Sequence, residues 1–514
     1  MRERYMKKNP EEIELEKIDI TGILKEEKPK KRKKKQDSTR GSKNSINNRE
    51  FAVVTYLFLT IFICLMGYMV YFQVARSEDF INSPYNTRQD SFATRIVRGE
   101  IRSADGKILA QTNTDADGTE TRYYPYSNLY AHVVGFASNG KSGIESMMNF
   151  NLLRSHTFIL ERVINEIKGE KSVGDNVITT LNSTLQETAY NALGDYDGAV
   201  IVMEPSTGKI LAMVSKPDFD PNTIAANWDS ITSEDSTESV LLNRATQGLY
   251  PPGSTFKILT TLEYMRENPD YTSFTYDCTG STTVDDTTIH CYGNEAHGQQ
   301  DLKTAFANSC NSAYATIGLT LDKTQFSKLC SSLLFNQTLP GNFATGKSSF
   351  SLTEDSSNGL VMQTSIGQGE TLVTPLHMAL ITSAIANNGV LMKPYVVDHT
   401  ENEAGVVVKS YEPAVYDAEF LSADETAVLQ EYMAYVVTNG TGAKLNGASY
   451  TAAGKTGSAE FSNDKSQSHS WFVGYAHRDD KTDIAVTVIA EGAGTGSTFA
   501  VPVAKQIFDA YYGD

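Results

Sequence analysis

The chain has 514 residues, which is long enough for two or more domains with a sizeable core. Hydrophobic residues make up 40% and charged residues 21%, a balance typical of a globular protein. The net charge is −17, but residues 1–50 carry 16 Lys and Arg against 10 Asp and Glu, which leaves 29 against 52 in the remainder. Because nucleic acids are bound by basic surfaces, so acidic a body excludes nucleic acid as an expected partner.

The first predicted element is an uncharged apolar stretch at residues 52–72, AVVTYLFLTIFICLMGYMVYF. At about 1.5 Å per residue, a helix of this length crosses a hydrocarbon layer of roughly 30 Å. A signal peptide has a shorter apolar region of about 7–15 residues, so an uncleaved anchor is favoured over a cleaved one. The basic run at 28–36 precedes the span and predicts a cytoplasmic tail. We therefore expect a disordered basic tail over 1–51, a transmembrane anchor over 52–74, and the rest of the chain outside the cytoplasmic membrane.

The part outside the membrane divides by its pattern into a smaller domain at 76–183 and a larger one at 184–514. Two β-rich runs, 199–203 and 209–214, are joined by a Pro-Ser-Thr-Gly turn and predict a hairpin. Three further strands are predicted near the end of the chain, before a closing helix at 501–513. Strands at both ends with helices between them predict an α+β fold, an antiparallel sheet flanked by helices. The helical patterns in between lie near 255–266, 301–319 and 375–388.

The sharpest local signal is LYPPGSTFKILTTLEYM at residues 249–265. Pro-Pro-Gly cannot continue a helix, so a helix is expected to begin near Ser254. Ser254 and Lys257 are three residues apart and share one helical face. A serine nucleophile needs an adjacent base, and a lysine can serve if burial or a nearby cation destabilises its ammonium form. Backbone N–H groups at the start of the helix can also stabilise an oxyanion.

Two short motifs follow this signal in the chain. Ser309-Cys310-Asn311 lies in a small-residue stretch that is expected to be helical, and Lys455-Thr456-Gly457 lies in a predicted strand. The Ser-x-x-Lys and Ser-x-Asn patterns are each common by themselves. The ordered set of three, each on its expected element, is the strong signal for serine acyl transfer.

This set resembles the serine penicillin-recognising enzymes, and the similarity to class B penicillin-binding proteins spans most of residues 86–512. Segments such as LLNRATQGLYPPGSTFK, AFANSCNSAYATIG and GKTGSAEF look like that family's transpeptidase domain. The resemblance implies a serine β-lactamase/transpeptidase-like domain that follows a pedestal domain. Two departures stand out: the pedestal motif usually has Asp-Arg where this chain has Ser103-Ala104, and the family usually has Thr where this chain has Ser458.

The resemblance implies a role for each matching residue. Ser254 is the acylated nucleophile and Lys257 its base. Ser309 relays a proton to the leaving amine, while Asn311 holds Lys257 and the substrate backbone. Lys455 binds the terminal carboxylate and lowers the pKa of Lys257 by repulsion. The expected catalytic residues are Ser254, Lys257, Ser309, Asn311 and Lys455, and the expected substrate-binding residues are Thr456, Gly457 and Ser458. Backbone N–H groups of Ser254 and Ser458 would form the oxyanion hole.

The implied activity is that of a peptidoglycan D,D-transpeptidase. Its partners would be stem peptides ending in D-Ala-D-Ala, β-lactams, the membrane, and a polytopic membrane glycosyltransferase docked on the anchor and pedestal. No cofactor is expected. A carboxypeptidase or endopeptidase outcome stays open, because water can replace the amine acceptor. A class A β-lactamase would need a Glu-positioned water, yet residues 312–353 contain no Glu. A sensor or scaffold is disfavoured by the short tail and by the complete motif set.

The cysteines and histidines give no clear signal. There is no C-x-x-C pair, and the sequence leaves open whether Cys278 and Cys291 form a disulfide. Gly367-Gln368-Gly369 lacks the lysine of a phosphate loop and is expected to be a tight turn near the site. Four histidines show no metal-ligand spacing and are expected to be structural, so no metal site is predicted: His290, His297, His377 and His469.

Overall fold

The structure is a computed structural model that describes residues 48–73, 95–157, 167–233, 239–460 and 468–513. The predicted basic tail therefore lies almost entirely outside the described residues. The chain forms two units, Met1–Val74 and Ala75–Asp514, and each is described by itself.

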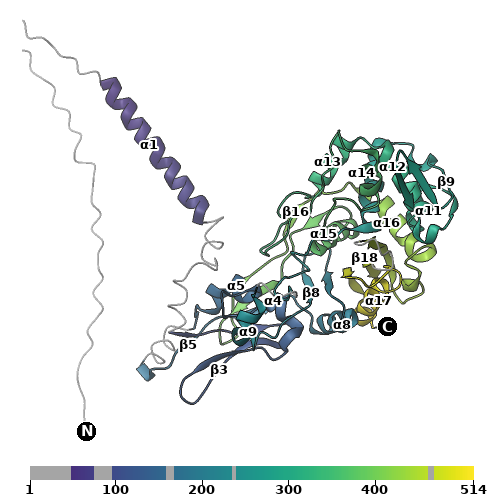
Figure 1. Cartoon of the computed structure of the whole chain (residues 1–514). Coiled ribbons are helices and arrows are strands. Elements are labelled where there is room, and N and C mark those ends of the chain that lie inside the picture. The colour runs from purple at the N-terminus through teal and green to yellow at the C-terminus, as the bar shows by residue number, and fades with distance from the viewer. Residues whose placement is uncertain (1–47, 74–94, 158–166, 234–238, 461–467, 514) are drawn as a thin grey trace, which may run out of the picture. The chain divides into compact units, whose positions relative to one another are not determined.

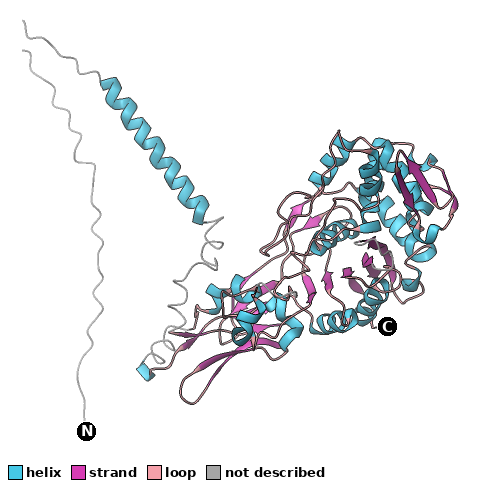
Figure 2. Ribbon diagram, viewed as in Figure 1, coloured by secondary structure: helices cyan, strands magenta, loops and turns pink. Residues whose placement is uncertain are grey.

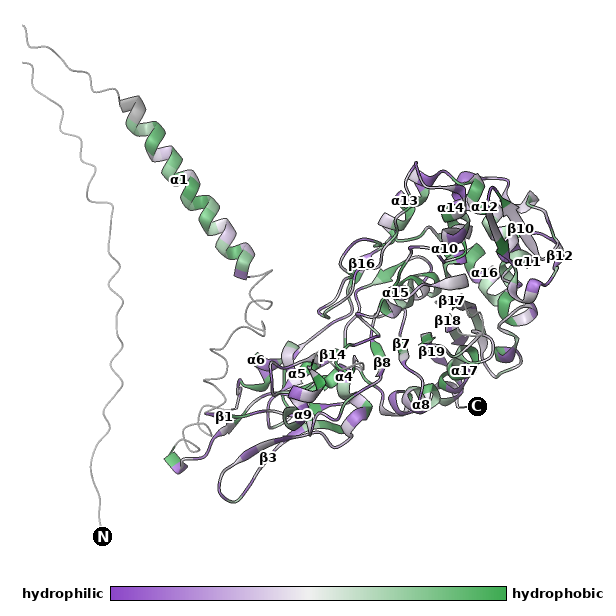
Figure 3. Ribbon diagram, in the orientation of Figure 1, coloured by the Kyte–Doolittle hydropathy of each residue, from purple (hydrophilic) through white to green (hydrophobic). Residues whose placement is uncertain are grey.

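The first unit contains one long helix, α1 (Asn48–Tyr71) (Figure 1). Its stretch Phe51–Tyr71 is long and apolar enough to cross a membrane, and none of it is buried. Figure 3 shows hydrophobic residues along most of this helix. An apolar helix without a polar face is unstable in water, so α1 fits a single-pass membrane anchor.

The core of the second unit is a five-stranded sheet in the order β17-β18-β19-β7-β8, with every neighbouring pair antiparallel. The strands are β7 (Gly198–Met203), β8 (Ile210–Lys216), β17 (Thr451–Glu460), β18 (Ser468–Arg478) and β19 (Lys481–Ala490). The predicted hairpin and the three late strands are therefore confirmed. β7 is buried at every position, because helices cover both faces of the sheet (Figure 2).

Two helices, α8 (Ser183–Leu193) and α17 (Ala500–Tyr512), pack side by side on one face of this sheet. Their apolar side chains form one core cluster with those of β7, β8, β18 and β19. The other face is covered by α15 (Pro375–Ala386), which packs against β7, β18 and β19. Eleven of its twelve residues are buried, which explains why it has no polar face. The predicted α+β fold is confirmed.

The remaining helices of this part surround the site and continue its core. They are α10 (Lys257–Glu267), α11 (Leu302–Ala307), α12 (Asn311–Thr320), α13 (Lys323–Ser332), α14 (Asn358–Ser365) and α16 (Ala423–Asn439). Short strands lie beside them: β9 (Tyr276–Cys278), β10 (Ser281–Val284), β11 (Thr287–His290), β12 (Gly298–Gln300), β13 (Leu391–Met392) and β16 (Val415–Asp417).

A six-stranded sheet in the order β15-β14-β6-β2-β3-β4 lies in the region expected to form the pedestal. It combines early strands with two from much later in the chain, where β14 pairs antiparallel with β6. Arg102 and Glu401 also form an ion pair across this junction, with 3.1 Å between Nη1 and Oε1. The sheet therefore extends beyond residues 76–183, which contiguous sequence patterns could not reveal. Its strands are β2 (Ile101–Arg102), β3 (Ile108–Thr114), β4 (Glu120–Tyr123), β6 (Asn176–Thr179), β14 (Val397–Glu401) and β15 (Val407–Ser410).

Smaller elements complete this region: β1 (Ile96–Val97), β5 (Ser172–Val173), α4 (Ala131–Val134), α5 (Gly143–Met147), α6 (Asn149–Leu152) and α9 (Ile224–Ile231). Its most buried charge is Glu145, whose carboxylate accepts hydrogen bonds from Arg98 Nε at 2.6 Å and from Arg122 Nε at 2.7 Å. Where the family's Asp-Arg pair was expected, Ser103 Oγ accepts a hydrogen bond from Lys107 N at 2.9 Å and closes a turn. Asp105 bonds the hydroxyl of Ser183 and so fixes the start of α8.

Candidate active site

Ser254 lies in a 3₁₀ turn, η5 (Gly253–Phe256), which leads directly into α10. The helix thus begins where Pro-Pro-Gly predicted it, with a tighter first turn. Side chains at i and i+3 eclipse in a 3₁₀ helix, so Ser254 and Lys257 face the same side. Ser254 is partly exposed, whereas Lys257 is fully buried.

Three oxygens surround the buried amine of Lys257. Its Nζ donates to the backbone carbonyl of Ser309 at 2.6 Å and to Asn311 Oδ1 at 2.7 Å, and it lies 3.3 Å from Ser309 Oγ. The ring of Tyr314 is 5.3 Å away. Burial lowers the pKa of Lys257 to about 7, because removal from water disfavours the ammonium form. The amine is therefore suited to accept a proton near neutral pH.

The Ser309 motif lies at a break between two helices rather than inside one. The continuous helix predicted over 301–319 was wrong, since α11 ends at Ala307 and α12 begins at Asn311. Ser309 has a φ of +54°, a left-handed conformation that costs a non-glycine residue about 1–2 kcal/mol. The break brings Ser309 Oγ to both site lysines.

Lys455, the fifth residue of β17, approaches Ser309 from the sheet. Its side chain is fully buried, and its Nζ donates to Ser309 Oγ at 2.9 Å and to the carbonyl of Thr456 at 3.1 Å. Burial, and then the charge of Lys257, hold the pKa of Lys455 well below its usual range. The repulsion between the two lysines therefore lowers the pKa of Lys455, whereas the pKa of Lys257 is lowered by burial and not, as expected, by Lys455.

The residues after Lys455 continue along β17 beside the serine turn. Thr456 Oγ1 shares a hydrogen bond of 2.6 Å with Thr441 Oγ1. A side chain on Gly457 would come within 3.0 Å of the Pro252 carbonyl, so the strand and the turn approach closely. Ser458 Oγ accepts a hydrogen bond from Gly496 N at 3.3 Å. The structure thus brings the eight expected residues to one place, with Ser254 and Ser458 on adjoining segments.

The loop at Gly367-Gln368-Gly369 supports the same turn, as expected from its glycines. Gly253 N donates to the Gly367 carbonyl at 2.9 Å, and a Cβ on Gly367 would meet Gly253 O at 1.9 Å. The Gln368 amide, oriented so that both bonds form, accepts from Glu460 N at 2.9 Å and donates to Glu460 O at 3.2 Å. The loop therefore joins the serine turn to the end of β17.

Sequence reasoning missed two contributors to the site, Thr441 and Tyr314. Neither lies in a recognisable motif, and each reaches the site through tertiary packing. Of the four histidines, His377 is buried and its Nε2 contacts the Leu333 carbonyl at 2.6 Å, which fits a structural role. His290 contributes its backbone carbonyl, which accepts from Asn311 Nδ2 at 2.9 Å.

Comparison with known proteins gives matches over most of the chain. The profile of the penicillin binding protein transpeptidase domain matches residues 198–509, and that of the penicillin binding protein A dimerisation domain matches 98–177. The peptidoglycan D,D-transpeptidase PbpA of Mycolicibacterium smegmatis is 30% identical over 491 residues, which cover 89% of this chain and 98% of that protein.

Solved structures agree with these matches. The D,D-transpeptidase domain of a peptidoglycan glycosyltransferase from Eggerthella lenta is 29% identical with a TM-score of 0.72, covering 82% of this chain and 99% of that one. The penicillin G acyl-enzyme complex of penicillin-binding protein A from M. tuberculosis is 26% identical with a TM-score of 0.72, covering 81% and 100%. With the transpeptidase profile matching more than half of its residues and a relative 30% identical along nearly its whole length, the chain belongs to the class B penicillin-binding proteins, the serine D,D-transpeptidases.

Proposed function

We propose that this chain cross-links peptidoglycan stem peptides as a D,D-transpeptidase through an acyl-enzyme on Ser254, and that β-lactams acylate the same residue. The observation that carries the proposal is the buried amine of Lys257. It donates hydrogen bonds to Ser309 and Asn311, and it lies on the same helical face as Ser254. A lysine with a pKa of about 7 is a competent general base at neutral pH. The acyl-enzyme structures of relatives support the same chemistry.

In the acylation step, Ser254 Oγ attacks the carbonyl of the penultimate D-Ala and transfers its proton to Lys257 Nζ. Backbone N–H groups of Ser254 and Ser458 stabilise the oxyanion that forms. The proton then passes through Ser309 Oγ, which contacts both lysines, to the amine of the terminal D-Ala as its peptide bond breaks. Free D-Ala leaves, and the donor peptide remains as an ester on Ser254.

The substrate's own charge would set the protonation of the two lysines. Two ammonium groups around one serine hydroxyl repel each other, so both are charged only at a cost. The terminal carboxylate beside Lys455 would hold the positive charge there and leave Lys257 neutral. Thr456 and Ser458 would supply hydroxyl donors to the same carboxylate, while Gly457 lets the strand lie close to the extended peptide.

In the second step, an amine of another stem peptide attacks the ester, regenerates Ser254 and forms the cross-link. Water in place of the amine would give a carboxypeptidase side activity. The stem peptide would lie along the edge of β17, which has no further strand beyond it in the described five-stranded sheet.

The anchor and pedestal complete the proposal. The tail before α1 would lie in the cytoplasm, because its basic run follows the positive-inside rule. The catalytic domain of residues 184–514 would then lie outside the cytoplasmic membrane, together with the pedestal of residues 76–183, to whose sheet it contributes β14 and β15. A polytopic membrane glycosyltransferase would supply the glycan strands and contact the anchor and pedestal.

Intact-mass spectrometry of the detergent-solubilised chain with benzylpenicillin tests the proposal. We expect a long-lived adduct equal to the whole drug that maps to Ser254 and is lost in Ser254→Ala. Transfer of a D-Ala-D-Ala donor to an amine acceptor is the second readout. Intact drug with no adduct would contradict Ser254 as the nucleophile, and hydrolysed drug with no adduct would indicate a β-lactamase.

A further inference from the structure

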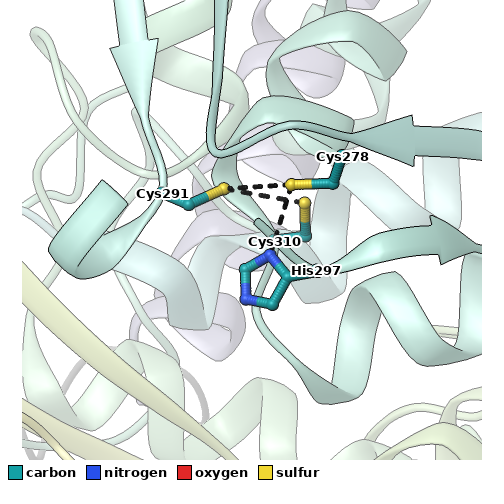
Figure 4. A group of neighbouring side chains, drawn as sticks. All are labelled: Cys278, Cys291, His297 and Cys310. Carbon is teal, nitrogen blue, oxygen red and sulfur yellow. Dashed lines mark hydrogen bonds between the residues drawn. The ribbon is translucent and has the colours of Figure 1, made fainter. Parts of the chain in front are cut away.

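Three cysteines and one histidine converge beside the active site. Figure 4 shows the sulfurs of Cys278, Cys291 and Cys310 and the ring of His297 pointing toward one another. Their potential ligand atoms all lie within 4.8 Å of one another. All three cysteines are buried and are free thiols. We name this set the Cys3His cluster.

Three distances within the cluster match those of a tetrahedral zinc site. With Zn–S bonds of about 2.3 Å, two thiolate ligands of one tetrahedral ion lie about 3.8 Å apart. The sulfurs of Cys291 and Cys278 are 3.7 Å apart, as are those of Cys291 and Cys310. A Zn–N bond of about 2.0–2.1 Å predicts an S–N separation near 3.6 Å. Cys278 Sγ and His297 Nδ1 are 3.4 Å apart.

The chemistry of the four groups selects the metal. Three thiolates and an imidazole form one of the ligand sets that proteins use for structural Zn²⁺, and soft sulfur ligands disfavour Mg²⁺ and Ca²⁺. Ser312 Oγ lies 3.2, 3.3 and 3.4 Å from the three sulfurs, where its hydroxyl can donate to a thiolate ligand. A disulfide between Cys278 and Cys291 would need the two sulfurs to approach to about 2.05 Å. It would also leave Cys310 and His297 without the two thiolates that complete a four-ligand metal site.

We propose that the Cys3His cluster binds one structural Zn²⁺ and that this ion holds the Ser309-Cys310-Asn311 motif in its catalytic geometry. All four coordination positions are filled by protein, which is the mark of a structural rather than a catalytic zinc. The spacing Cys-x12-Cys-x5-His-x12-Cys differs from short-spaced zinc motifs, which explains why the sequence predicted structural histidines and no metal.

The ion would act on the motif from two sides. Cys310 stands between Ser309 and Asn311 in the chain, so a bond to Cys310 fixes the segment that carries both. Asn311 Nδ2 also donates to the carbonyl of His290, the residue before Cys291, at 2.9 Å. Two of the proposed metal ligands, Cys310 and Cys291, are therefore directly next in the chain to residues that hold Lys257 or Asn311.

The elements that bring the ligands together are short strands that contact α11, α12 and α14. Cys278 ends β9, Cys291 follows β11, and His297 precedes β12. β9 and β12 form one two-stranded sheet, and β10 and β11 form another. Two-stranded sheets are marginally stable in water by themselves. A metal ion that links both sheets to Cys310, at the start of α12, would therefore stabilise this segment.

The first test is metal content of the full chain, purified in detergent with ZnSO₄ present and then desalted. We expect about one zinc per chain by elemental mass spectrometry. Replacement by Co²⁺ should give visible absorption of a tetrahedral ion with sulfur-to-metal charge transfer. Cys291→Ser and His297→Ala should lower zinc content at least severalfold. Cys330→Ser, at a buried cysteine outside the cluster, and Cys64→Ser, in α1, should retain it.

The wild-type spectrum keeps the test decisive even if a cluster variant fails to fold. Wild-type chain that binds neither Zn²⁺ nor Co²⁺ would overturn the site, and a Cys278–Cys291 disulfide found by mass under non-reducing conditions would replace it. Loss of zinc in Cys330→Ser alone would also contradict the assignment.

The effect on catalysis rests on the proposed function and has its own readout. Chelation of zinc should slow acylation by a fluorescent penicillin roughly 10–100-fold, the usual effect of lost support around a site, and added Zn²⁺ should restore it. Unchanged acylation after chelation would overturn the positioning role. A chain that binds zinc but is never acylated would contradict the proposed function and leave the metal site in place.

Discussion

At the scale of single residues, the site depends on two buried lysines that share one serine hydroxyl. Lys257 and Lys455 are both fully buried, and both contact Ser309 Oγ. A buried ammonium is costly unless it is paired, so each lysine is shifted toward its neutral form. Under the proposed function, this cost is what would let Lys257 act as a base at neutral pH.

Lys257→Arg tests that conclusion because it keeps a positive charge and removes the base. A guanidinium cannot be deprotonated in a protein, so Ser254 would lose its proton acceptor. We expect acylation by penicillin to fall by about 10²–10⁴-fold, the usual contribution of a general base. The control is Lys303→Arg, at an ion pair with Glu431 outside the site, which should leave the rate unchanged. Equal rates in Lys257→Arg and wild type would show that another group accepts the proton.

The pH dependence of acylation follows from the same pKa. Lys257 accepts a proton only when neutral, and burial lowers its pKa to about 7. The acylation rate constant should therefore rise with pH through about 7 and level off above it. Stopped-flow measurement of penicillin acylation between pH 5.5 and 9 checks this. A rate that falls across the same interval would mean that the protonated amine is the active form.

At the scale of elements, the turn that carries Ser254 is fixed by backbone contacts. Gly367 has a φ of +78°, and its α-carbon faces the Gly253 carbonyl so closely that a Cβ would lie 1.9 Å away. Gly253 itself has a φ of +53°. Tight backbone packing of this kind needs glycine, because any side chain would move the serine turn.

Gly367→Ala should therefore damage the site more than its backbone strain alone explains. Gly405→Ala is the matched control, since Gly405 also has a φ of +78° but nothing lies within 4 Å of its Cβ position. Both variants incur roughly 1–2 kcal/mol of left-handed strain. Only Gly367→Ala should also slow acylation, by up to about 10²-fold, because small displacements of reacting groups have large effects. Thermal unfolding and acylation rates separate the two effects, and similar acylation in both variants would contradict the packing argument.

At the scale of the molecule, the six-stranded sheet combines strands from the pedestal with the late strand β14. β14 follows α15, a helix of the catalytic region, in the chain. It pairs with β6 on one side and with β15, the next strand along the chain, on the other. Ile101 and Val177 face each other in the neighbouring pair of the same sheet. The pedestal and the catalytic region therefore share a folded sheet.

Two fragments test this connection. A chain of residues 75–514 keeps every strand of the sheet, whereas a chain of 184–514 lacks β6 and exposes the edge of β14. We expect the longer fragment to unfold in one transition and to be acylated by penicillin. The shorter one should melt several degrees lower, because β14 loses its ladder of hydrogen bonds to β6. Equal melting temperatures would show that β14 needs no partner.

The sequence by itself determined the long apolar helix, the hairpin of β7 and β8, the late strands, the fold class and which motif residues would gather around Ser254. These features depend on contiguous apolar runs, turn residues and short motifs, which are local and therefore readable along the chain. Only the tertiary structure decided the break at Ser309, the pairing of β14 with β6 and the convergence of Cys278, Cys291, His297 and Cys310. Each of these joins residues far apart in the chain, or bends a helix to suit a distant partner, and no local pattern encodes such contacts.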